Sequence, residues 1–158
     1  MSDIVNHECG IALIRLIKPL EYYLSKYGTS FYGLKKLHLL MHKQHNRGQD
    51  GAGIAGLKID ISPGNKYISR IRSNSENPVK DIFNEIYDKI AEVQTKSPGR
   101  INDPQWLKNN LDFTGELLLG HLRYGTFGSN DVKNLHPVIR SNNWKTRNLV
   151  LAGNFNMT

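Results

Sequence analysis

The sequence predicts an α+β protein in which helices pack against antiparallel strands. Short apolar runs of strand length recur along the chain, and other segments carry apolar residues at helical spacing. The order of these elements is not the regular strand–helix alternation that is typical of parallel sheets. The 158 residues are enough for about one domain with a sizeable core.

Two elements are predicted near the start of the chain. Residues 10–16 form a short apolar run, GIALIRL, which predicts a buried strand. A tyrosine-rich stretch ending at Gly28 follows. Residues 33–46 then predict an amphipathic helix that is stopped by the glycines after it. Its apolar face consists of Leu34, Leu37, Leu40 and Met41.

The next segments predict a pair of strands. Residues 52–59, AGIAGLKI, are small and apolar, and residues 66–71 alternate between apolar and polar. The Pro63-Gly64-Asn65 turn separates the two segments.

The second half of the chain predicts one long helix and two more strands. The helix opens at Asn77-Pro78, and one face carries Val79, Ile82, Phe83, Ile86, Ile90 and Val93. Residues 97–103 are expected to be a surface loop. Residues 117–123 predict a strand covered on both faces, and residues 148–153 predict the last strand.

The composition of the chain argues against several classes of protein. Lys and Arg number 21 against 14 Asp and Glu, but the basic residues are dispersed, so we expect no nucleic-acid partner. One Cys excludes an intramolecular disulfide framework. No apolar run reaches the length of about 18 residues that a membrane span needs, and the first residues do not resemble a secretory signal. These features predict a cytoplasmic protein without a membrane partner.

Cys9 lies directly before the first predicted strand. Its position fits either a buried small hydrophobe or a thiolate nucleophile. If residues 1–8 are removed, Cys9 carries a free α-amino group, which titrates at about 7.7–8.0 and can act as a general base on its own thiol. The interpretation as a nucleophile therefore requires cleavage after Glu8.

Three other segments carry candidate site residues. The polar loop before residue 52 has Arg, Gln and Asp in close succession, which is more than a turn requires. On the strand 117–123, His121 and Arg123 share one face, and Arg123 either binds a ligand or pairs with an internal acid. After the last strand, Asn154 can present an amide and nearby backbone N–H groups to an oxyanion.

Histidines at positions 38, 42 and 45 have a spacing that could hold a metal. No acidic pattern accompanies them, so we interpret them as a solvated polar face and expect no metal site.

Taken together, the segments HECGIALIRL, HNRGQDGAGIAG, GHLRYGTFG, NLHPV and LAGNFN resemble those of the N-terminal-nucleophile, or class II, glutamine amidotransferases. Within this group the RGQD loop and Tyr124 are most similar to the amidophosphoribosyltransferases. The resemblance extends from Cys9 to the end of the sequence. It implies an αββα sandwich that is incomplete at the C-terminus, with a leader at 1–8 and a partial glutaminase domain at 9–158.

The resemblance implies hydrolysis of glutamine through a thioester on Cys9, whose freed amine is the base. Arg47 and Gly48 match the loop beside the nucleophile. Arg123 matches the arginine that binds the glutamine α-carboxylate, and Thr126 matches its neighbour in that pocket. Two alternatives remain. One is a class II amidotransferase with another ammonia acceptor, and the other is an inactive homologue that binds a ligand without catalysis.

Asn154 matches the family's oxyanion donor. Phe155 stands where the family usually has Gly, but its backbone N–H is retained as a donor. The ammonia acceptor implied is phosphoribosyl pyrophosphate, in the first committed step of purine biosynthesis. That reaction needs a C-terminal phosphoribosyltransferase domain, and the resemblance implies that this domain binds Mg²⁺. The resemblance also implies that the full-length protein is a homo-oligomer. We expect no cofactor in this chain, and we expect the chain alone to lack the family's acidic residue for the glutamine amine.

Overall fold

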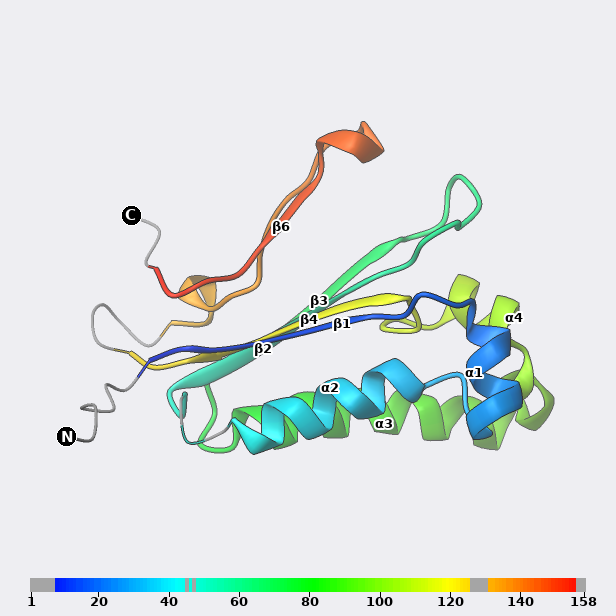
Figure 1. The fold of residues 1–158 in the computed structure, drawn as a ribbon, viewed down its shortest axis with the longest axis horizontal. Coiled ribbons are helices and arrows are strands. Elements are labelled where there is room, and N and C mark those ends of the chain that lie inside the picture. Colours follow the sequence, from blue (N-terminus) through cyan, green and yellow to red (C-terminus); the bar gives the residue numbers. More distant parts are fainter. Residues whose placement is uncertain (1–7, 45, 47, 126–130, 156–158) are drawn as a thin grey trace.

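The computed structural model describes residues 8–44, 46, 48–125 and 131–155. Its centre is a four-stranded antiparallel sheet in the order β1-β4-β2-β3 (Figure 1). The strands are β1 (Gly10–Arg15), β2 (Gly51–Leu57), β3 (Ile68–Ser73) and β4 (Leu117–Arg123). The α+β class is therefore confirmed.

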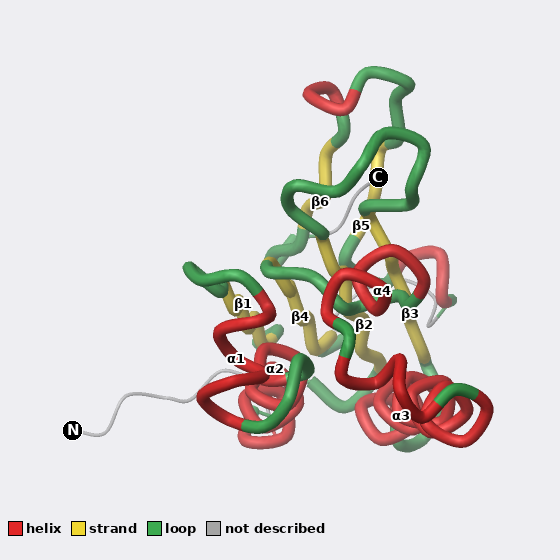
Figure 2. The backbone as a smooth tube through the Cα atoms, turned by 90° about the vertical axis from the view of Figure 1, so that its right-hand side faces the viewer, coloured by secondary structure: helices red, strands yellow, loops and turns green. Residues whose placement is uncertain are grey.

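Two helices cover one face of this sheet. They are α2 (Tyr32–Lys43) and α3 (Pro78–Lys96), which lie side by side beneath the strands in Figures 1 and 2. Burial of their apolar faces against the strands creates the main core, which provides most of the driving force for this layer. Its fully buried members include Leu37, Met41, Ile54, Phe83 and Leu122.

A second, two-stranded sheet lies on the other side of the main sheet from the helices (Figure 1). It pairs β5 (Val138–Arg140) with β6 (Leu149–Leu151). The segment that leads into β5 lies close to β2, because a Cβ at Gly53 would collide with the His136 carbonyl oxygen. Arg72 on β3 donates to the Leu135 carbonyl at 2.7 Å and fixes the same segment.

The alternation of side chains along β4 decides what reaches each face. A Cβ at Gly120 would meet Met41 and Leu37, so this residue faces the helices. His121 and Arg123 therefore point to the opposite face, toward the segments around β5 and β6. The prediction that these two side chains share a face is confirmed.

The predicted strands and helices all occur, with ends shifted by a few residues. The elements that were not predicted include α1 (Leu20–Tyr27), α4 (Pro104–Asn110), β5, and the 3₁₀ helices Val132–Asn134 and Lys145–Arg147. The expected loop at 97–103 was wrong, because Pro98–Asn102 forms a 3₁₀ helix. Among the described residues, no helix has the length and apolar character needed to cross a membrane.

The tyrosine-rich stretch forms the helix α1, and the residues at its two ends account for where the helix begins and ends. Pro19 occupies the N-cap and Gly28 ends the helix at a φ of 69°, a left-handed conformation that glycine adopts without a steric penalty. The Gly28 N–H donates to the Leu24 carbonyl at 2.9 Å. The apolar periodicity of the segment is weak because tyrosines replace the usual aliphatic residues.

Candidate functional site

A cavity of about 160 Å³ lies at the end of β4, on the face away from the helices. Three distant parts of the sequence contribute to it: the residue before β1, the end of β4, and the segments that flank the small β5–β6 sheet. Its lining residues are Cys9, His121, Arg123, Tyr124, Asn134, His136, Asn154 and Phe155.

Four residues predicted from the sequence meet in this cavity: Cys9, Arg123, Asn154 and Phe155. Cys9 is half-buried and is a free cysteine. Two predicted positions, Arg47 and Thr126, lie outside the described residues.

Gly48, the remaining predicted residue, does not line the cavity but packs directly behind it. A Cβ at this position would lie 2.5 Å from the Leu122 carbonyl carbon and 2.8 Å from the Arg123 backbone nitrogen. Real Cβ atoms do not approach backbone this closely, so the loop needs glycine here in order to contact β4. The contact holds the loop against the strand end that carries Arg123.

Asp50 ties the same loop to the residues after β4. Its backbone N–H donates to the Arg123 carbonyl at 3.2 Å, and its carboxylate accepts from the Gly125 N–H at 2.7 Å. These two hydrogen bonds lie on either side of Tyr124 and fix the path of the chain as it leaves the strand. Asp50 therefore has a structural role beside the cavity.

Arg123 is buried, with 6% of its surface exposed, and its guanidinium reaches the cavity. One terminal nitrogen donates to the Asn134 carbonyl at 3.1 Å. A guanidinium can bind a carboxylate through two parallel N–H groups in a fork geometry. The cavity thus contains a guanidinium and a thiol.

Two histidines, His121 and His136, complete the wall, and their roles were not predicted. The Nε2 atom of His121 lies 3.1 Å from the Gly153 carbonyl oxygen, and Nδ1 of His136 lies 3.0 Å from the same atom. The rings are 4.8 Å apart. The sequence analysis singled out the GHLR and LHPV segments, which contain these two histidines. Neither segment by itself indicates that the two side chains contact the same carbonyl.

Burial keeps both imidazoles neutral. Desolvation lowers the pKa of His121 from 6.5 to about 4, and the nearby His136 ring, where it is protonated, acts in the same direction. The pKa of His136 is also lowered, chiefly by desolvation, although its hydrogen bond with Gly153 opposes the shift. At neutral pH each ring therefore has one N–H to donate and one lone pair.

The histidines on α2 are not in this cavity. The His38 ring stacks on Phe83 with centroids 4.0 Å apart, and its Nδ1 lies 3.1 Å from the Tyr87 hydroxyl. His38 is thus part of the contact between α2 and α3 rather than of a solvated face, and that part of the interpretation was wrong. His45 lies outside the described residues.

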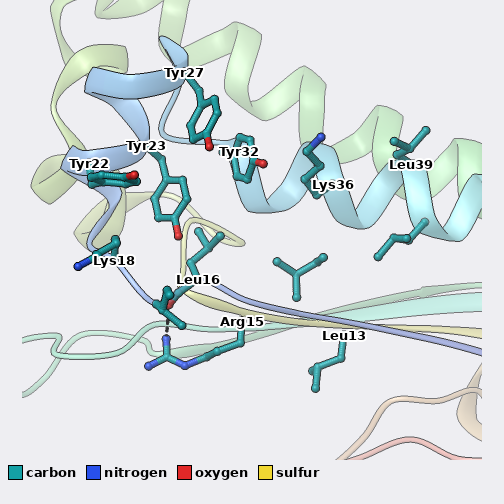
Figure 3. A pocket seen from close by; sticks show the side chains of 13 residues that line it. Leu13, Arg15, Leu16, Lys18, Tyr22, Tyr23, Tyr27, Tyr32, Lys36 and Leu39 are labelled. Atoms are coloured by element: carbon teal, nitrogen blue, oxygen red, sulfur yellow. Dashed lines mark hydrogen bonds between the residues drawn. The ribbon is translucent and has the colours of Figure 1, made fainter.

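A larger groove of about 580 Å³ lies between β1 and the helices α1 and α2 (Figure 3). Its wall is a group of stacked tyrosines, in which Tyr27 and Tyr32 have centroids 4.3 Å apart and Tyr23 and Tyr32 have centroids 5.2 Å apart. Lys36 lies over the Tyr32 ring at 5.3 Å. None of the predicted site residues lines this groove, so size alone does not identify the site.

The chain was compared with protein-family models, curated proteins and solved structures. No protein-family model, no curated protein and no solved structure matches the chain.

Proposed function

We propose that this chain is the glutaminase portion of an amidophosphoribosyltransferase and that it hydrolyses glutamine to glutamate and ammonia. The observation that supports the proposal is the shared cavity of Cys9, Arg123, Asn154 and Phe155. These residues come from both ends of the described chain and from its central strand, and their side chains and backbone supply a nucleophile, a carboxylate anchor and amide donors.

Arg123 anchors the substrate in this proposal. Its guanidinium binds the α-carboxylate of glutamine, which directs the side-chain amide toward Cys9. The family resemblance alone assigns Arg47 and Thr126 to glutamine binding, and Gly48 supports the pocket from behind through its contact with the β4 backbone.

The reaction begins with Cys9 at a new N-terminus, after residues 1–8 have been removed. Its α-amine accepts the thiol proton, and the thiolate attacks the amide carbon of glutamine. The Asn154 side-chain amide and the Phe155 backbone N–H donate to the oxyanion that forms. When the carbon–nitrogen bond breaks, the protonated amine gives its proton to the leaving group, which departs as ammonia.

Hydrolysis of the thioester completes the cycle. Water attacks the thioester carbonyl, which forms a second oxyanion that the same donors stabilise. Collapse of this intermediate releases glutamate and the Cys9 thiol. Phosphoribosyl pyrophosphate is the proposed acceptor of the ammonia, on a phosphoribosyltransferase domain in a homo-oligomer. Mg²⁺ would serve that domain, and no residue of this chain is assigned to it.

The proposed architecture is the αββα sandwich of N-terminal-nucleophile hydrolases. The helix layer on one face of the main sheet and the β5–β6 sheet on the other support this arrangement. The proposed compartment is the cytoplasm.

The first test is the intact mass of the protein after incubation with a diazo-ketone analogue of glutamine. We expect a chain that begins at Cys9 and carries one adduct, and we expect Cys9→Ala to carry none while remaining folded by circular dichroism. Glutamine should prevent the labelling in proportion to its concentration. A full-length, unmodified chain would reject the glutaminase proposal for this protein.

Phe155 favours one alternative, a homologue that binds an amino acid without turning it over. Its ring occupies part of the cavity wall, 4.8 Å from the His136 ring, where the family usually has no side chain. Isothermal titration with glutamine separates the two functions, because a binding protein would give heat without any release of ammonia. An amidotransferase with another acceptor would release ammonia equally well.

A further inference from the structure

We infer that His121 and His136 are positioning residues that jointly hold the Gly153 carbonyl and thereby fix the segment that carries Asn154 and Phe155. The inference rests on the proposed function, since it assigns these residues to the alignment of the oxyanion donors. Neither histidine is assigned to contact glutamine.

Donation by both rings to this carbonyl needs a different tautomer in each ring. His121 directs Nε2 at the carbonyl oxygen from 3.1 Å, whereas His136 directs Nδ1 at it from 3.0 Å. A carbonyl oxygen has two lone pairs and can accept from both. Each contact is favourable only if the ring nitrogen that faces the oxygen carries the proton, so His121 is the Nε2–H form and His136 the Nδ1–H form.

One of the remaining ring nitrogens supports this assignment directly. Nδ1 of His121 is buried and has no hydrogen-bond partner among the described residues, which suits a lone pair better than an N–H group. The Gly153 backbone N–H lies 3.4 Å from the Nδ1 atom of His136 and would donate to it only in the other tautomer. The contact of Nδ1 with the carbonyl oxygen is shorter, at 3.0 Å, and we assign the Nδ1 proton to this contact.

The held carbonyl controls the next residue through the peptide plane. The Gly153–Asn154 peptide is planar and trans, so a fixed carbonyl direction fixes the opposite direction of the Asn154 N–H. His136 also packs against Phe155, with ring centroids 4.8 Å apart. Asn154 therefore lies between two residues that His136 contacts, and Gly153 is additionally held by His121.

Isosteric amides test the inference at each ring. The amide nitrogen of Gln overlaps the Nε2 position of histidine, and that of Asn overlaps the Nδ1 position. We expect His121→Gln to keep most of the glutaminase kcat that His121→Asn loses, and His136→Asn to keep most of the kcat that His136→Gln loses. The losses should be about 10–10²-fold in kcat, with KM for glutamine within about 2-fold.

The matched control is His42→Gln, an exposed histidine on α2 that should leave both constants unchanged. A merely structural role would predict equal losses for Asn and Gln at each position, and that result would overturn the inference. Equal effects on kcat and KM would overturn it as well.

A second measurement needs no activity. Long-range proton–nitrogen NMR spectra of the histidine rings at pH 7 should show the Nε2–H form for His121 and the Nδ1–H form for His136. If both rings are the same tautomer, the inference fails whatever the enzyme does. If the tautomers are opposite but glutamine is not hydrolysed, the proposed function fails, and with it the catalytic role of the pair, while the shared carbonyl contact stands.

Discussion

At the scale of single residues, Arg123 is a buried arginine at the wall of the cavity. One terminal nitrogen donates to the Asn134 carbonyl, and the side chain lines the cavity. A guanidinium keeps its charge in such a place and offers several N–H groups in one plane, whereas a lysine has a single point charge on a flexible stem.

The Arg123→Lys variant is expected to raise KM for glutamine by about 10–100-fold, because a charge-assisted hydrogen bond contributes about 1.5–3 kcal/mol. The kcat should fall much less, since the lysine does not change the nucleophile. Steady-state release of ammonia checks both constants. An unchanged KM would assign Arg123 a structural role only.

The residue scale also shows how far the sequence could predict the site. Cys9, Arg123 and Asn154 could be predicted as candidates because each has side-chain chemistry that stands out in its local segment, and all three line one cavity. His136 lies next to a proline in a short polar segment, and its role depends on a carbonyl 17 residues away. A contact of that kind leaves no periodic pattern in the sequence.

At the scale of elements, the contact between the Gly48 loop and β4 links the helix α2 to the site. The loop follows α2, and its glycine touches the backbone at Leu122 and Arg123. The position of the strand end therefore depends on a residue without a side chain.

The Gly48→Ala variant is expected to lower stability by about 1–3 kcal/mol, because the added Cβ forces the loop away from the strand. It should also lower kcat/KM by displacing Arg123. Urea unfolding and ammonia release measure the two effects. Gly99→Ala is the control: nothing lies within 4 Å of a Cβ there, so its stability should change by less than about 0.5 kcal/mol.

Elements differed in how well the sequence predicted them. The helix α3 has six apolar residues on one face over 19 residues, β2 is a continuous small or apolar run, and β4 begins as one, so the pattern was clear. The helix α4 has only seven residues and β5 has three. Elements this short form mainly because their neighbours pair with or pack on them, and that information is not local.

On the scale of the whole molecule, a buried ion pair joins α4 to the start of β4. Lys108 and Glu116 are each about 8% exposed, and their charged atoms lie 2.5 Å apart. The other carboxylate oxygen of Glu116 accepts from the Ile59 N–H at 2.8 Å. One carboxylate thus connects three separate parts of the chain.

The Glu116→Ala variant is expected to lower the free energy of unfolding by about 3–5 kcal/mol, because it leaves a buried ammonium without its partner. The matched control is Glu85→Ala, which breaks the exposed i,i+4 pair with Lys89 and should cost less than about 0.5 kcal/mol. Chemical denaturation of both variants checks the contrast. Similar losses would contradict the assignment of Glu116 to the core.

The stability of the molecule should also fall in mild acid. The pKa of His121 is about 4 in the folded chain and 6.5 in the unfolded one, so the unfolded state binds more protons between these values. The contribution is complete above pH 6.5, decreases as the pH falls, and is lost below about 4. Its full size corresponds to about 3 kcal/mol. The lowered pKa of His136 acts in the same direction.

Urea unfolding at pH 7.5 and 4.5 measures this dependence. The His121→Gln variant removes the titrating group and should reduce the difference between the two pH values. The His42→Gln variant keeps both buried rings, so a smaller difference there would attribute the effect to another part of the chain.

The two tryptophans lie in different parts of the fold. Trp106 on α4 packs against the helix–sheet core, whereas Trp144, 65% exposed, lies on the turn between β5 and β6. Replacing either one with Phe leaves a single tryptophan, whose fluorescence can be excited separately from that of the tyrosines and without any attached dye. The emission of Trp106 would then follow the main core, and that of Trp144 would follow the small sheet whose flanking segments form the cavity. Fluorescence can therefore determine whether the site assembles in the same transition as the core or in a separate one.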